Sequence, residues 1–139
     1  MDDAELNATV AAEQACSATT VRFFHFLDRG KYEALAGLLT ENCVWLRQGQ
    51  ELAGRTAVLD KMRERAPGLS TRHLLSNIVV DLVSEREAHV GYELTVYARP
   101  EGKPARLATI MTGEDTLERT EAGWCIRLKK AQPVFSFPD

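Results

Sequence analysis

The spacing of apolar side chains divides the sequence into a helical first part and a second part made of strands. Residues 3–29 contain neither proline nor glycine, and their periodicity predicts one long helix that Gly30 ends. The helix face expected to point inward carries Val10, Ser17, Val21, Phe24 and Asp28.

Two shorter helices and a short strand are expected next. Residues 31–39 have apolar positions at helical spacing, as do residues 55–65, which Pro67 and Gly68 end. Between these two helices, the residues around 44–47 predict a strand that turns at Gln48 and Gly49.

Beyond residue 68 the apolar period changes from 3.6 to 2, which indicates strands. Four strands are expected, over residues 72–83, 88–99, 106–119 and 123–134. Helices followed by hairpin-linked strands are typical of an α+β fold. We therefore predict a single domain over residues 1–139, with the helices packed on one face of a curved antiparallel sheet.

The strand at residues 72–83 raises the first question about function. Strict alternation places His73, Leu75, Asn77, Val79 and Asp81 on one face, and the intervening residues on the other. Both faces are largely apolar at first, so His73 is expected to be buried or to face a pocket. It is either a hydrogen-bonded core residue or part of a site.

Asp28 breaks two local rules. It continues an inward-facing stripe, and it lies in the last turn of its helix, where the macrodipole disfavours an acid. Such conflicts concentrate at functional sites, although an ion pair with Arg29 or Lys31 would also absorb them. If Asp28 is catalytic, Asp28→Asn is expected to preserve or raise the stability; if it only ties the helix to the sheet, the stability should fall.

Charge and composition narrow the function classes. A net charge of −3 with interspersed signs does not favour nucleic-acid binding. The acidic start lacks the features of a signal peptide and no apolar run would span a bilayer, so we expect a soluble cytoplasmic protein without a membrane partner. Cys16, Cys43 and Cys125 are expected to be reduced packing residues.

No cofactor and no metal are expected. The sequence contains no glycine-rich phosphate loop and no HxH or HExxH motif. The two acidic pairs, Asp2-Asp3 and Glu114-Asp115, are interpreted as a helix N-terminus and a strand edge.

Four stretches together resemble the SnoaL-like branch of the nuclear-transport-factor-2-like superfamily. They are FHFLDRGKYEALAGLLTENCVW, GRTAVLDKMRER, TRHLLSNIVVD and GEDTLERTEAGWCIRLKKA. The resemblance implies a cone-shaped α+β fold whose bent sheet wraps around helices and encloses an apolar pocket. It also implies that Asp28 and His73 match the Asp and His that face each other in scytalone dehydratases and bile-acid dehydratases.

An Asp-His pair can act as a general base. A carboxylate that accepts from one imidazole nitrogen fixes the tautomer, so the other nitrogen can take a proton next to a carbonyl. The expected function is therefore a small cofactor-independent lyase, isomerase or cyclase that acts on an apolar carbonyl compound. The stretch RLATIMTGE lacks the second histidine of scytalone dehydratase, which argues against a close copy of that reaction.

The alternative is a non-catalytic protein, either a scaffold or a ligand-binding module. Two of these stretches, TRHLLSNIVVD and GEDTLERTEAGWCIRLKKA, together with LTVYARPEG, also resemble the β subunits of ring-hydroxylating dioxygenases. That resemblance would make His73 a packing or interface residue. This chain is shorter than those subunits usually are, and a scaffold does not require the Asp28/His73 pair.

Other residues are candidates for the pocket wall and for an interface. The expected wall is formed by Phe24, Tyr32, Trp45, Leu59 and Met62. Apolar positions on the strand at residues 88–99 are too many to leave in water, so we expect them to be covered by a second subunit or by a helix. These positions are Val90, Tyr92, Leu94 and Val96. A homodimer or homotrimer that binds an apolar small molecule is the predicted state.

Overall fold

A computed structural model of the chain describes residues 1–138, and it confirms the α+β class. The helices are α1 (Asp3–Asp28), α2 (Tyr32–Ala36) and α3 (Arg55–Arg63). The strands are β1 (Leu39–Arg47), β2 (Gln50–Ala53), β3 (Ser70–Leu82), β4 (Glu87–Arg99), β5 (Arg106–Thr120) and β6 (Gly123–Ser136). The four long strands lie within about three residues of their predicted bounds.

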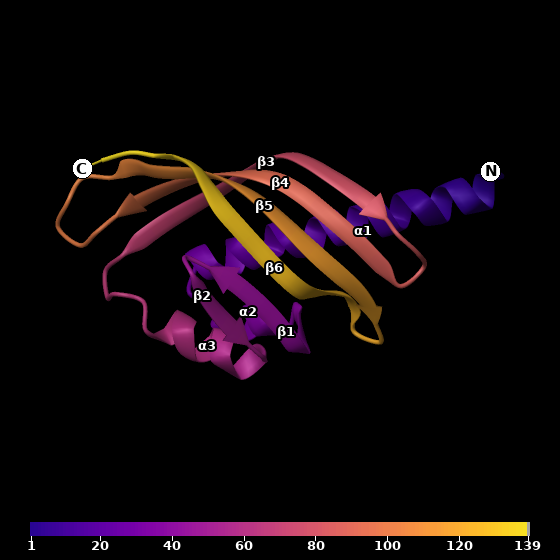
Figure 1. The fold of residues 1–139 in the computed structure, drawn as a ribbon, viewed down its shortest axis with the longest axis horizontal. Coiled ribbons are helices and arrows are strands. Elements are labelled where there is room, and N and C mark those ends of the chain that lie inside the picture. Colours follow the sequence, from indigo (N-terminus) through magenta and orange to yellow (C-terminus); the bar gives the residue numbers. More distant parts are fainter. Residues whose placement is uncertain (139) are drawn as a thin grey trace.

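The six strands form one bent sheet in the order β2-β1-β6-β5-β4-β3, and the helices lie on one face of it (Figure 1). The sheet is mixed rather than antiparallel, because β1 pairs with β6 in parallel. The predicted turn at Gln48 and Gly49 is confirmed: both residues have positive φ, 48° and 74°, as a tight hairpin turn between β1 and β2 requires.

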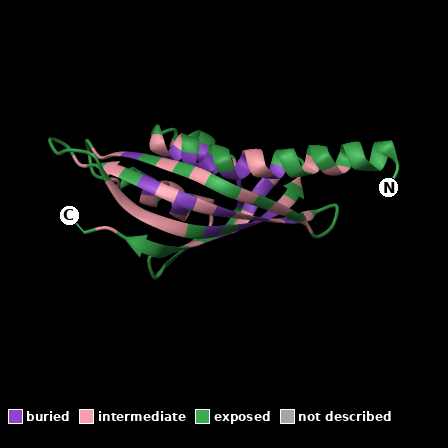
Figure 2. Cartoon of the chain, turned by 90° about the horizontal axis from the view of Figure 1, so that it is seen from above, coloured by how far each residue is buried: buried purple, intermediate pink, exposed green. Residues whose placement is uncertain are grey.

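The buried face of α1 differs from the predicted one. Phe24 is buried as expected, but Val10 and Val21 are 46% and 40% exposed. The residues that pack inward are Cys16, Thr19, Thr20, Phe23, Phe24 and Leu27. The buried face of α1 includes Thr19 and Thr20, which make it less apolar than the face chosen from the sequence. The apolar pattern therefore indicated the wrong face of the helix. The N-terminal half of α1 extends beyond the sheet and is mostly exposed (Figure 2).

A β-bulge in β3 changes which residues share the face of His73. Asn77 has a φ of 52°, and the pairing with β4 shifts between Ser76 and Val79. The extra residue inverts the alternation, because successive side chains of a strand point to opposite faces. Asn77 and Val79 are therefore exposed, contrary to the prediction. The inward side chains after the bulge are Ile78, Val80 and Leu82.

The apolar positions of β4 are covered by the chain itself. Val90, Tyr92, Leu94 and Val96 are at most 8% exposed, and they belong to the same core cluster as the inner residues of α1. These positions were expected to be buried by a second subunit or by a helix, and the structure shows them packed against α1. These side chains consequently give no argument for an oligomer.

Candidate active site

Asp28 and His73 meet where the end of α1 reaches the start of β3. His73 Nδ1 lies 2.5 Å from Asp28 Oδ1, and the backbone N–H of His73 donates to Asp28 Oδ2 at 2.7 Å. The Asp28 side chain is 4% exposed and that of His73 is 13% exposed. The pair is thus withdrawn from bulk water and held by both backbone and side chain.

A third donor orients the Asp28 carboxylate. The hydroxyl of Thr71 donates to Asp28 Oδ1 at 2.8 Å, and Arg65 donates to the Thr71 oxygen at 2.9 Å. Because the guanidinium can only donate, the Thr71 hydroxyl keeps its hydrogen for Asp28. The chain of contacts runs from Arg65 through Thr71 and Asp28 to His73.

These contacts resolve the conflict that the sequence placed at Asp28. Burial acts to raise the pKa of Asp28, but the hydrogen bonds and charge of His73, with the bond from Thr71, outweigh burial and lower it. The carboxylate is therefore bonded to His73, not paired with Arg29 or Lys31. Since an ionised Asp28 has three donors, we now expect Asp28→Asn to reduce the stability by about 1–3 kcal/mol, whether or not Asp28 is catalytic.

The lowered pKa of Asp28 predicts a specific loss of stability in acid. An acid with a depressed folded-state pKa stabilises the protein above its unfolded-state pKa of about 3.9, and this contribution is lost as the pH falls through the folded-state value. Urea unfolding of the wild type and Asp28→Asn at pH 3 to 5 should show a difference at about pH 5 that shrinks below about pH 4. Asp60→Asn, at an exposed position, is the matched control. A difference unaffected by acid would contradict the prediction.

His73 opens onto a partly enclosed cavity of about 140 Å³ between the helices and the sheet. The cavity is lined by Phe24, Leu27, Trp45, Arg47, Gln48, Arg65, His73, Leu94, Val96, Thr109, Met111, Lys129 and Ala131. Phe24 stacks on the imidazole with ring centroids 5.1 Å apart. Six of the 13 lining residues have polar side chains, so the pocket is less apolar than the resemblance implied.

The expected wall residues separate into two groups. Phe24 and Trp45 line the cavity of His73, whereas Tyr32, Leu59 and Met62 do not. Met62 is buried in the core, Tyr32 packs against the core cluster from α2, and Leu59 is half-buried on α3. Thr109 and Met111 come from the stretch that lacks a second histidine, and they fill part of the wall.

A buried ion pair beside the cavity escaped the sequence interpretation. Lys129 Nζ donates to both oxygens of Asp115 at 2.9 Å, and their side chains are 2% and 0% exposed. Thr20 and Tyr92 donate their hydroxyls to the same carboxylate at 2.8 and 3.0 Å. Asp115 was interpreted as part of a strand edge, which is wrong. Its register partner Val90 lies on an apolar strand, which was the available signal.

Burial shapes the titration of the groups around this ion pair. Burial lowers the pKa of Lys129, and the charge and hydrogen bonds of Asp115 oppose that shift. Burial, together with Asp115, raises the pKa of Tyr92, which therefore stays a phenol. Burial also raises the pKa of the Cys16 thiol to about 11. All three cysteines are free and buried, as predicted.

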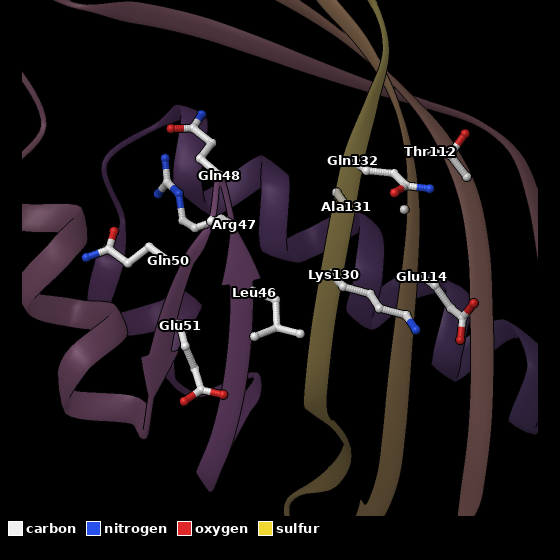
Figure 3. A pocket seen from close by; sticks show the side chains of 12 residues that line it. Leu46, Arg47, Gln48, Gln50, Glu51, Thr112, Glu114, Lys130, Ala131 and Gln132 are labelled. Carbon is white, nitrogen blue, oxygen red and sulfur yellow. The ribbon is translucent and has the colours of Figure 1, made fainter.

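A larger groove of about 590 Å³ lies on the outer face of the sheet and contains neither Asp28 nor His73 (Figure 3). The β1–β2 hairpin lines one side of it, and β5 and β6 line the other, with the register partners Glu114 and Lys130. Of these two spaces, the smaller cavity is the one that His73 lines, with Asp28 bonded to the imidazole.

Residues 1–138 contain neither a metal-binding cluster nor a membrane-spanning helix. No group of three or more His, Cys, Asp or Glu side chains in this part of the chain is arranged to hold a metal ion. None of its helices is long and apolar enough to cross a membrane.

Asp2 serves as the cap of α1, as its position predicted, by accepting from the backbone of Glu5 at 2.7 Å.

Comparison with known proteins identifies the family. The chain belongs to the SnoaL-like domain family, whose model matches residues 8–130. No protein with a curated description matches the sequence.

Several solved structures share the fold at low sequence identity. A candidate scytalone dehydratase from Novosphingobium aromaticivorans is 23% identical, with a TM-score of 0.82 over 95% of this chain and 90% of that one. A candidate aromatic ring hydroxylase from the same organism is 15% identical, with a TM-score of 0.80 over 91% of each chain. A Catenulispora acidiphila protein in complex with S-DNPA is 21% identical, with a TM-score of 0.75 over 91% of this chain and 94% of that one.

Proposed function

We propose that the protein is a small cofactor-independent enzyme that removes a proton from the carbon next to a carbonyl group. The observation that carries this proposal is the 2.5 Å contact between His73 Nδ1 and Asp28, with the same imidazole lining a cavity. The family includes dehydratases and cyclases, and a neighbour of the same fold holds a small molecule, which supports a reaction of this class.

The step needs no group beyond the pair and the substrate. Asp28 accepts from Nδ1–H, so Nε2 carries the lone pair that takes the proton. The electron pair of the broken C–H bond moves to the carbonyl oxygen and forms an enolate. Return of the proton at another carbon completes an isomerisation, attack of the enolate carbon on a second carbonyl completes a cyclisation, and loss of a β-hydroxyl as water completes a dehydration.

Hydrogen–deuterium exchange tests this step without knowledge of the natural substrate. The protein is incubated in D₂O with 2-tetralone or 4-oxo-4-phenylbutanoate, and deuterium at the carbon next to the carbonyl is followed by NMR. We expect exchange above the buffer rate that His73→Gln abolishes, because the base is gone. Exchange at the buffer rate with both ketones would contradict the proposal.

The second candidate is a non-catalytic ligand-binding or scaffold protein. One observation favours it: the carboxylate of Asp28 accepts from the backbone of His73, so it also fastens α1 to β3. A protein of this kind would bind the ketones without exchanging their protons. The exchange measurement therefore separates the two candidates.

A further inference from the structure

Two arginines share the cavity wall with His73. Arg47 is the last residue of β1, and Arg65 follows α3. Both are half-buried rather than extended into solvent. Arg47 lies over the ring of Trp45, 4.7 Å from its centroid, and Arg65 is held by its bond to Thr71. Each guanidinium is thus fixed by one contact and keeps further N–H donors.

Neither arginine forms a direct ion pair with the described part of the chain. Within residues 1–138, no carboxylate lies within ion-pair distance of Arg47 or Arg65. Burial and the nearby charge of Arg65 both lower the pKa of Arg47, so the two cations repel each other across a partly dry space. An anion placed between or beside them would relieve this repulsion.

The rest of the lining does not offset the positive charge of the two arginines. Lys129 is the third cation, but Asp115 already neutralises it. No Asp or Glu occurs among the lining residues in the described part of the chain. A sheltered cavity walled by one sign of charge focuses its potential and attracts the opposite charge.

We infer that Arg47 and Arg65 bind a carboxylate of the substrate, which is a carbonyl compound about the size of one ring. The size follows from the cavity of about 140 Å³, since a cavity of about 150 Å³ holds benzene in another protein. A guanidinium fork matches the two oxygens of a carboxylate. This inference rests on the proposed function for the carbonyl, but the anion site itself does not depend on turnover.

Matched acids and amides test the anion site by binding alone. Benzoate, phenylacetate and 3-phenylpropanoate are each compared with their primary amide, using ligand-observed NMR and the intrinsic tryptophan fluorescence, to which Trp45 in the cavity wall contributes. We expect at least one acid to bind about ten- to a hundredfold more tightly than its amide, because a hydrogen-bonded charge pair is formed. Added salt should weaken the acids and leave the amides unchanged.

Two variants locate the effect. Arg47→Gln should bring the acid and the amide within about threefold of each other, because one of the two cations is lost. Lys130→Gln removes the same charge from the outer groove, and it should leave the preference intact. Arg65 is not used, because it also orients Thr71 toward Asp28.

The outcomes separate this inference from the proposed function. Any one of three results would overturn the anion site, even if proton exchange occurs. They are equal affinity for acids and amides, no binding of any acid at about 10 mM, and equal effects of Arg47→Gln and Lys130→Gln on the preference for acids. A preference that depends on Arg47, in a protein without exchange activity, would support the anion site and refute the proton abstraction.

Discussion

Lys129→Met is expected to destabilise the protein by about 3–5 kcal/mol, the largest effect of any single change considered. Methionine preserves the length and most of the volume of the side chain but removes the ammonium group. The Asp115 carboxylate, 0% exposed, would then stay buried without its cation. The hydroxyls of Thr20 and Tyr92 would still donate to it, but they carry no charge.

A double variant and a neighbour make this measurement specific. Lys129→Met/Asp115→Asn should recover a large part of the loss, because the unpaired charge is gone while the amide oxygen still accepts hydrogen bonds. Lys130→Met changes an exposed lysine next in sequence and should stay within about 0.5 kcal/mol of the wild type. Urea unfolding measures all three. A loss below about 1 kcal/mol in Lys129→Met would show that the pair contributes little.

Asp28→Asn is expected to slow proton exchange by about 10²-fold or more while the protein remains folded. The carboxylate accepts from Nδ1 of His73 and so leaves the lone pair on Nε2. An asparagine amide can instead donate to Nδ1, which favours the tautomer with hydrogen on Nε2, where it cannot act as a base. The geometry of the pair would change little, but the base would be in the wrong protonation state.

The same Asp→Asn change at an exposed site is the control. Asp60 on α3 lies 3.9 Å from Arg63, with most of its side chain in solvent, and Asp60→Asn should exchange protons at the wild-type rate. The rates are measured by NMR at a temperature where circular dichroism shows each variant to be folded. A folded Asp28→Asn that exchanges within threefold of the wild type would indicate that Asp28 only ties α1 to β3.

The helices and strands could be predicted from the sequence because the spacing of apolar residues within each element determines them. The periods of 3.6 and 2, with Gly30, Pro67 and Gly68 as ends, predicted the helices, the four long strands and the α+β class. The conflict at Asp28 also marked a residue that the structure places in a polar contact with His73. Each of these signals lies within about one turn of helix or a few residues of strand.

Only the tertiary structure decided which side chains share the cavity. The bulge at Asn77 inverted the alternation of β3, and the buried face of α1 proved to be the one with two threonines. The parallel pairing of β1 with β6 makes Trp45 and Lys129 register partners although they are far apart in sequence. Such contacts depend on sheet curvature and pairing over long distances, which no local pattern encodes.

The same reason explains the charged groups of the site. Arg47 and Arg65 belong to separate elements, and each alone is an ordinary surface-type residue in the sequence. They line the cavity of His73 together only because β1 and the end of α3 pack next to it in the folded chain. The sequence by itself determined the elements and the acid/base candidates, and the packing of distant elements determined the charge and the size of the space around them.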